Sequence, residues 1–257
     1  MKYFYLIFII FVLCSVTLCT KGSILNRAYA KTDGTLFFVN DRPYDHTFPY
    51  WVVKWFDWFL SLPNIENVND ESKAHPRDHY SPEKCSWNQN GSSPVWMLSD
   101  GPDKNDLSVL EARDCKVPAG KALLVQIVGS NCSPNEGYKN DQELLNCAAW
   151  ILDQARFSAS VDGKEVLNTD KNLSDKEKIY TKPFITPLNY GKNNYYHDPE
   201  GKVRGAGAGY FLFVKPLPVG NHIIKYEESV VNALDSTGND KRISGLEYHI
   251  DVENMTR

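Results

Sequence analysis

The sequence GYFLFVKPLPVGNHIIKYEESV, residues 209–230, decides the fold class of this chain. Its first part, GYFLFVK, is apolar and aromatic, as in a buried strand, and its last part, NHIIKYEESV, alternates apolar and polar residues, as in a half-buried strand. PLPVG between them has the composition of a turn. The stretch therefore predicts a long β-hairpin, and ARFSASV, Asp162-Gly163 and KEVLN predict another one earlier in the chain.

Strand patterns recur on both sides of these hairpins. Four more strands are expected, at TLFFVN (35–40), PVWMLS (94–99), KALLVQIV (121–128) and GLEYHIDVE (245–253). The third of these is nearly all apolar, which is typical of a central strand. We therefore expect a mainly β (α+β) protein, an antiparallel β-sandwich or jelly-roll-like domain with two packed helices at about 49–62 and 141–154.

The later helix has a recognisable beginning. Asn140 is a good N-cap, and Glu143 follows three residues later, as in a capping box. Leu144, Ala148 and Ile151 then recur at helical spacing. The pattern predicts a helix with one apolar face over about 141–154.

The earlier helix contains YWVVKWFDWFLSLP (50–63), with tryptophans at positions 51, 55 and 58. It can be interpreted as a core helix, as an aromatic platform for a ligand or as a membrane-seeking helix. At 1.5 Å per residue it is only about 20 Å long, too short to cross a bilayer, and it lacks the basic face of an interfacial helix. A helix that is apolar around most of its circumference is usually buried, so the pattern favours the core helix.

The N-terminal segment has the features of a secretory signal peptide. Lys2 is followed by an apolar run from Tyr3 to Cys19 and then by the small-x-small pattern Ala28-Tyr29-Ala30. We expect residues 1–30 to be a cleaved signal peptide, with no membrane span left after cleavage. An uncleaved anchor helix is the alternative.

Cleavage would leave an acidic domain. Residues 1–30 contain three basic residues and no acidic one, so the formal charge falls from −4 for the full chain to −7 for residues 31–257. Such a surface disfavours nucleic acid and anionic lipid as partners. We expect a single exported β-rich domain over 31–257, with a possible subdivision near residue 150, that is secreted or held in the extracytoplasmic cell envelope. Four Asn-x-Ser/Thr tripeptides are candidate glycosylation sites: Asn90, Asn131, Asn172 and Asn254.

Four cysteines remain after the leader, at positions 85, 115, 132 and 147. An even number in an exported chain predicts two disulfides, and the spacings lack the CxxC of a zinc site or redox pair. Three pairings are possible. We predict the sequential one, Cys85–Cys115 and Cys132–Cys147, because it closes the shortest loops.

Three segments stand out together: HPRDHYSPEKCSWNQNGSSPVWML (75–98), CKVPAGKALLVQI (115–127) and GYFLFVKPLPVGNHIIKY (209–226). They resemble a family of secreted bacterial and archaeal proteins of unassigned function. Its members share a tryptophan-rich helix, an HP…D…C…Q…GPVWFL stretch, VPAGKALFFP and a late GY…KPLPPGKH segment. Here Ser93 stands in place of the glycine before PVW, and Met97 in place of a phenylalanine. The resemblance implies an exported β-rich fold and implies no particular reaction.

The strongest candidate for metal chemistry is HPRDH, in which His75, Asp78 and His79 can supply ligands for zinc or copper. Pro76 places these residues in a loop, so helical spacing does not bring the two rings together. A fourth ligand would have to come from elsewhere, for example His46 or His197. The alternative interpretation is a solvated polar loop.

Two acidic stretches and one glycine-rich stretch are weaker candidates. SDGPDKND, with Asp100, Asp103 and Asp106, lacks the residue order of an EF-hand, so a solvated turn is favoured over a calcium loop. The same holds for DSTGND (235–240). RGAGAGY (204–210) lacks the order of a nucleotide-binding motif and predicts either a mobile loop or backbone that passes close to another strand.

No nucleophile elbow, HExxH helix or papain-type cysteine context occurs in the sequence. We therefore assign no catalytic residue, expect no cofactor, and predict a non-catalytic exported β-sandwich that serves as a cell-envelope binding or accessory module for an unknown envelope or extracellular ligand. The alternative is an extracellular enzyme that depends on a divalent metal (zinc, copper or calcium) and is centred on His75, Asp78 and His79. The two hypotheses differ in whether those three side chains meet other polar groups in a pocket.

Overall fold

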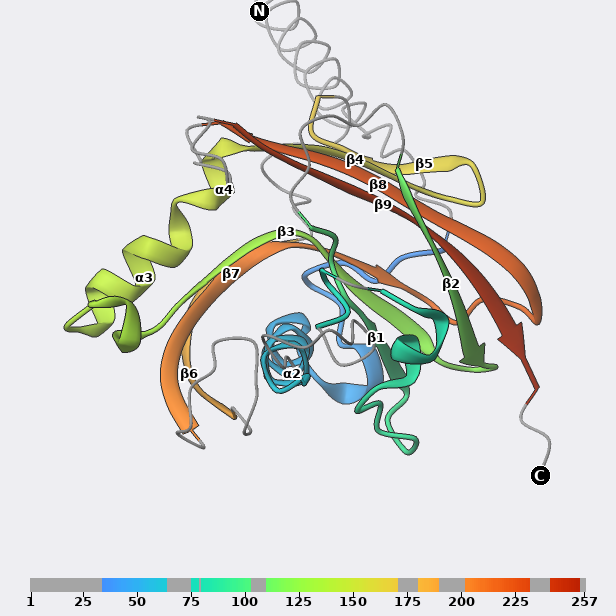
Figure 1. The fold of residues 1–257 in the computed structure, drawn as a ribbon, viewed down its shortest axis with the longest axis horizontal. Coiled ribbons are helices and arrows are strands. Elements are labelled where there is room, and N and C mark those ends of the chain that lie inside the picture. The colour runs from blue at the N-terminus through green and yellow to red at the C-terminus, as the bar shows by residue number, and fades with distance from the viewer. Residues whose placement is uncertain are drawn as a thin grey trace, which may run out of the picture. The chain divides into compact units, whose positions relative to one another are not determined.

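The computed structural model describes residues 34–63, 75–78, 80–102, 110–170, 180–189, 202–231 and 241–254. Thr35–Arg257 makes one compact unit. Its strands form two sheets that pack together, and helix α2 (Phe48–Leu60) lies against the sheet that is drawn in the middle of Figure 1. The expected mainly β sandwich is confirmed.

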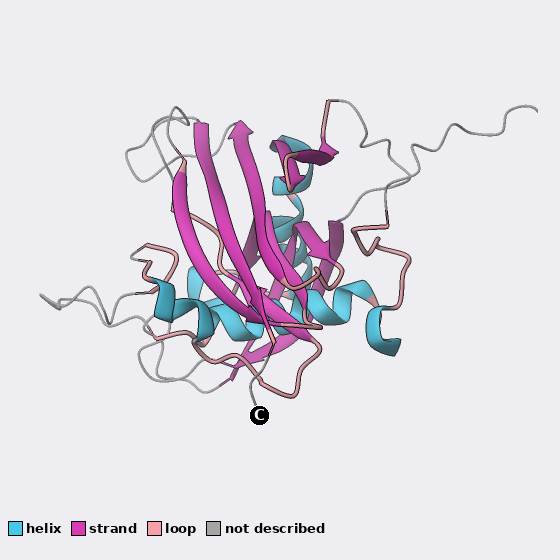
Figure 2. Ribbon diagram, turned by 90° about the vertical axis from the view of Figure 1, so that its right-hand side faces the viewer, coloured by secondary structure: helices cyan, strands magenta, loops and turns pink. Residues whose placement is uncertain are grey.

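Both sheets are mixed rather than wholly antiparallel. The four-stranded sheet has the order β1 (Val95–Leu98), β3 (Ala122–Cys132), β7 (Lys202–Val214) and β6 (Tyr180–Asn189). The five-stranded sheet has the order β2 (Glu111–Pro118), β9 (Lys241–Glu253), β8 (Gly220–Val231), β4 (Ala155–Val161) and β5 (Lys164–Asn168). The pairs β1–β3 and β2–β9 are parallel, and the other pairs are antiparallel. Figure 2 shows the long strands running side by side.

The prediction of a hairpin at residues 209–230 is wrong, because its two strands lie in different sheets. β7 pairs with β3 and β6, whereas β8 pairs with β4 and β9. Residues 215–219 link the two sheets, and their two prolines, Pro216 and Pro218, have no amide N–H with which to continue a ladder. The link therefore joins the layers of the sandwich instead of closing a hairpin.

The shorter hairpin is confirmed. β4 and β5 pair antiparallel, and both residues of the turn, Asp162 and Gly163, have positive φ, at 51° and 74°. Two successive positive φ angles are the geometry of the tight turns whose twist matches that of the strands. By contrast, the strand expected at 35–40 is reduced to a single bridge, between Leu36 and Val214.

Helix α2 begins after the N-cap Thr47, whose side chain accepts from the amide of Tyr50. Trp51 and Trp55 are 5 % and 0 % exposed, so the core interpretation of the tryptophan-rich helix is confirmed for these two residues. The Trp55 indole donates to the carbonyl of Leu98 at 2.8 Å and stacks on the ring of Phe59 at 4.7 Å. The helix is thereby fixed to strand β1 of the four-stranded sheet. The described part of the chain contains no helix long and apolar enough to cross a bilayer.

The glycine-rich stretch 204–210 lies within β7 and lets this strand approach its neighbours closely. A Cβ atom at Gly207 would lie 2.7 Å from the ring of Phe56, and one at Gly209 would lie 2.6 Å from the carbonyl oxygen of Val128. Neither position has room for a side chain. Of the two interpretations of this stretch, close backbone approach is confirmed.

The helix expected at 141–154 is divided at Trp150 into α3 (Asp141–Ala149) and α4 (Ile151–Gln154). The side chain of Asn140 accepts from the amide of Glu143 at 3.0 Å, so the expected N-cap is confirmed. The Glu143 carboxylate accepts from the amide of Lys139 at 2.6 Å.

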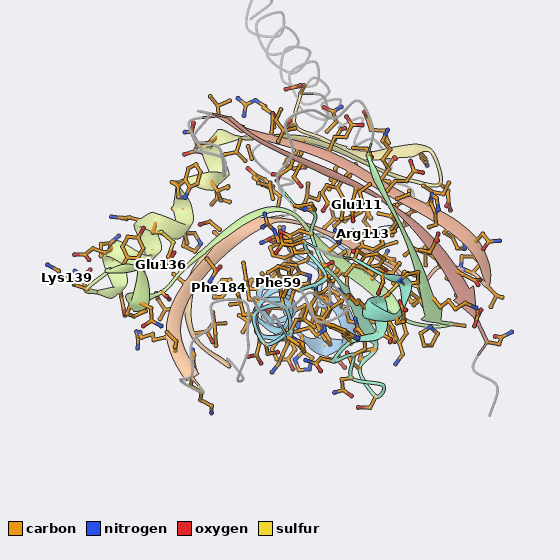
Figure 3. All side chains as sticks on the ribbon, viewed as in Figure 1. Phe59, Glu111, Arg113, Glu136, Lys139 and Phe184 are labelled. Atoms are coloured by element: carbon orange, nitrogen blue, oxygen red, sulfur yellow. A yellow bond between two sulfur atoms is a disulfide. The ribbon has the colours of Figure 1, made fainter. Side chains whose placement is uncertain are left out.

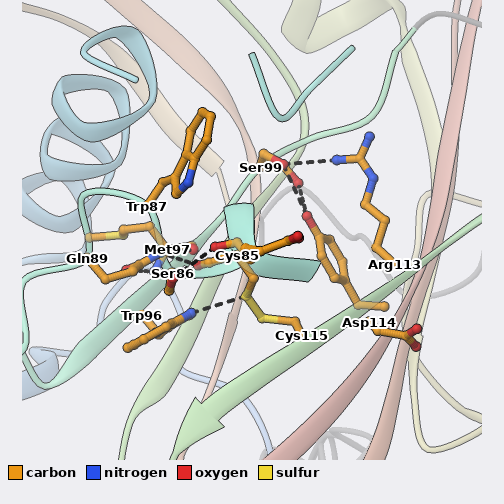
Figure 4. The surroundings of a disulfide bond; sticks show 12 residues. Cys85, Ser86, Trp87, Gln89, Trp96, Met97, Ser99, Arg113, Asp114 and Cys115 are labelled. Carbon is orange, nitrogen blue, oxygen red and sulfur yellow. Dashed lines mark hydrogen bonds between the residues drawn. A yellow bond between two sulfur atoms is a disulfide. The ribbon is translucent and has the colours of Figure 1, made fainter. Parts of the chain in front are cut away.

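A side chain lies along the outer edge of β1. The amide of Met97 donates to Oε1 of Gln89 at 3.1 Å, and Nε2 of Gln89 donates to the carbonyl of Met97 at 2.7 Å (Figure 4). Nε2 also donates to the carbonyl of Cys85 at 3.2 Å. Gln89 thus occupies the position that a neighbouring strand would take.

Candidate ligand-binding groove

The structure places the expected metal ligand His75 in the interior rather than in a polar loop. Its Nδ1 accepts from the amide of Arg77 at 3.1 Å, so Nε2 carries the proton and donates to the carbonyl of Phe59 at 3.1 Å. Burial lowers the pKa of His75 to about 3, and the positive charges of Arg77 and Arg113 act in the same direction. The ring is neutral, and both of its nitrogens are engaged by the protein.

The other expected ligands do not gather around His75. Asp78 is exposed, with its carboxylate 3.4 Å from Arg77 Nη1, and His46 stacks on Tyr50 at the surface, with ring centroids 4.0 Å apart. His79 and His197 lie outside the described residues, as do Asp103, Asp106 and 235–240. Asp100 lies with its Oδ2 3.6 Å from Arg77 Nε. Among the described residues no three His, Cys, Asp or Glu side chains form a metal-binding group, and the site at His75, Asp78 and His79 stays a hypothesis.

Both predicted disulfides are confirmed. Cys85–Cys115 and Cys132–Cys147 have Cα–Cα distances of 5.6 and 6.2 Å. The first joins β2 to the 3₁₀-helix η3 (Pro82–Ser86), and the second joins β3 to α3. The indole of Trp96 donates to Sγ of Cys85 at 3.5 Å (Figure 4). Among the candidate glycosylation sites, Asn90 and Asn254 are exposed, Asn131 is half-buried, and Asn172 lies outside the described residues.

A surface groove of about 740 Å³ crosses three strands of the five-stranded sheet beside η3. Alternate residues of these strands make two rows of outward-facing side chains. The register aligns Asp114, His249 and Ile223 in one row, and Lys116, Asp251 and Asn221 in the next. The remaining lining residues are Pro82, Glu83, Cys85, Ser86, Cys115, His222 and Ile250. We call this feature the β2–β9–β8 groove.

Both histidines of the groove lie beside carboxylates. His249 Nε2 is 2.8 Å from Glu247 and its Nδ1 is 3.2 Å from Asp114. The hydrogen bond to Glu247 and, to a smaller extent, the one to Asp114 raise the pKa of His249. Burial would lower the pKa of His222, but hydrogen bonds to Asp162 at 2.8 Å and to the carbonyl of Pro218 at 2.9 Å outweigh it and raise the pKa. Protonated histidines would therefore sit next to compensating negative charges.

The 3₁₀-helix η3 forms one wall of the groove. Arg113 lies behind the groove on the inner face of β2 and is completely buried. Its guanidinium donates to the carbonyl of Arg77 at 2.8 Å, to the Ser99 hydroxyl at 2.9 Å and to the Asp100 carbonyl at 3.1 Å. Its Nε donates to Glu111 at 2.6 Å, and these two residues are labelled between the sheets in Figure 3.

The ring of Tyr80 links this buried arginine to the groove. The Arg113 guanidinium lies 4.7 Å from the centre of that ring, and the Tyr80 hydroxyl donates to the carbonyl of Asp114 in the groove at 2.8 Å. Tyr80 lies two residues before the start of η3. The position of η3 beside β2 is therefore fixed by a cation–π contact, a hydrogen bond and the Cys85–Cys115 disulfide.

The sequence interpretation did not single out Arg113 or the groove. Arg113 alternates with Cys115 and Val117 in EARDCKVP, and this period of two is the pattern of a buried strand face with one charged member. That strand itself was not predicted. The groove has no local pattern, because its lining residues come from segments between positions 82 and 251.

No known protein-family model matches the chain, and no curated protein matches it either. The resemblance to secreted proteins therefore stays a prediction. The function has to be inferred from the groove and from the chemistry of its residues.

Proposed function

We propose that this protein is a non-catalytic exported β-sandwich module that binds an envelope or extracellular ligand in the β2–β9–β8 groove. The observation that carries the proposal is the groove itself. At about 740 Å³ it falls within the usual range for ligand sites, and it combines an exposed apolar side chain, Ile223, with charged groups. Its floor consists of hydrogen-bonded strands and its wall is fixed by a disulfide, so the site would lose little conformational entropy on binding.

The engagement of the polar groups supports binding rather than catalysis. His249 has a carboxylate at both ring nitrogens, so neither nitrogen is available as a base for the Ser86 hydroxyl, which donates to the carbonyl of Glu83 at 2.8 Å. Cys85 and Cys115 are joined in a disulfide and cannot act as thiolate nucleophiles. A general base must have a ring nitrogen within reach of the proton that it abstracts, and both nitrogens of His222 are also engaged, by Asp162 and by the carbonyl of Pro218.

The two disulfides support an extracytoplasmic location. Structural disulfides persist in oxidising compartments and are rare where thiols are kept reduced. Export would follow from the signal-peptide pattern of residues 1–30. We propose that the protein works as a secreted or envelope-held accessory module.

Two substitutions on one strand test whether the groove is the binding face. Ile223 and Val231 both lie on β8 and are 44 % and 48 % exposed, but only Ile223 lines the groove. The exported protein is screened against soluble peptides and cell-wall oligosaccharides by isothermal titration calorimetry. Ile223→Asp should abolish binding of a hit, whereas Val231→Asp should leave it unchanged. Equal binding by parent and Ile223→Asp would move the site elsewhere, and turnover of a bound compound would contradict the non-catalytic role.

A further inference from the structure

The charges of the groove favour one sign of ligand. Glu83, Asp114 and Asp251 line it, and Lys116 is the only lysine or arginine among the described lining residues. Three carboxylates and one lysine give a formal charge of −2 with neutral histidines. Lys116 is itself occupied, with Asp251 3.7 Å away and Glu253 in direct contact. A ligand that enters the groove therefore meets unbalanced negative charge.

The histidines do not reverse this sign near neutral pH. Each is paired with a carboxylate that lies outside the lining set, His249 with Glu247 and His222 with Asp162. Protonation of either ring would therefore be matched by a nearby negative charge. Glu83 and Asp114 remain accessible to a ligand, since Glu83 is exposed and Asp114, although one of its oxygens lies 3.2 Å from His249, has a side chain that is 74 % exposed. These two carboxylates decide which charged group is attracted.

The spacing of the floor adds a geometric condition. The two rows of side chains are two residues apart along each strand, which corresponds to about 7 Å. Alternate side chains of an extended peptide have the same spacing. Ile223 lies in the row of Asp114 but two strands away, about 10 Å across the sheet. A peptide that runs along the middle strand β9 would therefore direct the side chains of one side at Asp114 and those of the other side at Ile223.

We infer that the groove takes an extended peptide segment in which basic and apolar side chains occur together, with the basic side chains directed at Glu83 and Asp114 and an apolar one at Ile223. This inference rests on the proposed function, since it names the ligand class of the same groove. A polyamine would pair with the carboxylates but leave Ile223 uncovered, and a neutral sugar would leave the carboxylates without a cationic partner.

Three blocked hexapeptides with a fluorescent label serve as probes: alternating lysine and leucine, glutamine and leucine, and glutamate and leucine. Fluorescence anisotropy with the exported protein at pH 7.5 measures the dissociation constants. The lysine peptide should bind more tightly than the other two. Its affinity should fall as salt is raised, because salt screens exposed charges.

A matched pair of variants locates the charges. The double variant Glu83→Gln/Asp114→Asn should weaken binding of the lysine peptide by about fivefold, as expected for two exposed ion pairs. Glu227→Gln is the control, because Glu227 is on the outward side of β8 but does not line the groove. It should bind like the parent.

Each other outcome overturns the inference. If the glutamine or glutamate peptide binds as well as the lysine peptide and Ile223→Asp abolishes that binding, the groove is a binding site but does not select cations. If the lysine peptide binds equally to the double variant, the attraction comes from another surface. If none of the three peptides binds, the peptide class is wrong, and the oligosaccharide arm of the earlier screen then decides whether the proposed function stands.

Discussion

Single side chains with a hydrogen bond deep in the core carry much of the specificity of this fold. Trp55 holds β1 through its indole N–H, and His75 joins the end of α2 to the segment that precedes η3. A buried polar group that loses its partner costs more than the hydrogen bond itself contributes. Substitutions at these two residues should therefore separate the packing contribution from the polar one.

Trp55→Ala should lower the free energy of unfolding by about 3–5 kcal/mol, because it empties a completely buried aromatic site. Trp55→Phe keeps most of the ring but leaves the Leu98 carbonyl without its donor, so a loss of about 1–3 kcal/mol is expected. Urea unfolding followed by fluorescence measures both. Equal stability of Trp55→Ala and the parent would contradict the core role of α2.

His75 should make the protein less stable in mild acid. With its pKa lowered to about 3 in the folded state, His75 stays mostly neutral from pH 6.5 down to about 4, whereas the unfolded chain takes up the proton, so stability falls as the pH falls. Between pH 6.5 and 5 the loss is about 2 kcal/mol. His222 and His249 act in the opposite direction, since their pKa values are raised, but they are also present in the control.

The control for this prediction is His75→Gln, whose side-chain amide can still donate to the Phe59 carbonyl. Its unfolding free energy should change less between pH 6.5 and 5, by about the 2 kcal/mol attributed to His75. Denaturant titrations at the two pH values give the comparison. Identical pH dependence of parent and variant would show that His75 titrates normally in the fold.

At the scale of elements, the features that depend on interactions between residues close in sequence could be predicted from the sequence. Three of them were predicted: the N-cap Asn140, the Asp162-Gly163 turn and the tryptophan-rich helix. Each depends on residues that lie within a few positions of one another. The link after β7 was misread, since its prolines and glycine are compatible with a hairpin and with a crossing between sheets. What distinguishes the two is the burial of β7 on both faces, which depends on the other sheet and on α2.

The two disulfides provide an element-scale test of the groove. Cys85→Ala/Cys115→Ala should cost about 3–4 kcal/mol of stability and release η3, while Cys132→Ala/Cys147→Ala should cost about 3 kcal/mol and leave η3 in place. Only the first double variant should lose affinity for a groove ligand. Calorimetric titration of both variants measures this, and unchanged affinity of the first would show that η3 is not a functional wall.

At the scale of the whole molecule, the sandwich brings together residues that no sequence window contains. Glu83 and Asp251 line one groove, and Arg77 and Arg113 share one buried cluster, although each pair is far apart in the chain. Length, cysteine pattern and strand patterns were sufficient for the fold class. The candidate site was not predictable, because it arises from the parallel pairing of β2 with β9, and that pairing leaves no pattern in either strand.

Export should be visible in the mature protein. N-terminal sequencing of material secreted by a host should find a chain that begins at or near Lys31, because the small-x-small pattern ends at Ala30. Mass mapping without reductant should find no free thiol among the four remaining cysteines. A chain that still starts at Met1 would favour the anchor helix instead.

The Gln89 side chain on the edge of β1 has a consequence for colloidal behaviour. An uncovered strand edge is a template on which a second copy can add, and copies that add in series form fibrils. By occupying the amide and carbonyl of Met97, Gln89 blocks that template with a single amide group. Gln89→Leu should therefore leave a folded protein that precipitates in a concentration-dependent way, and thioflavin fluorescence over time would follow it.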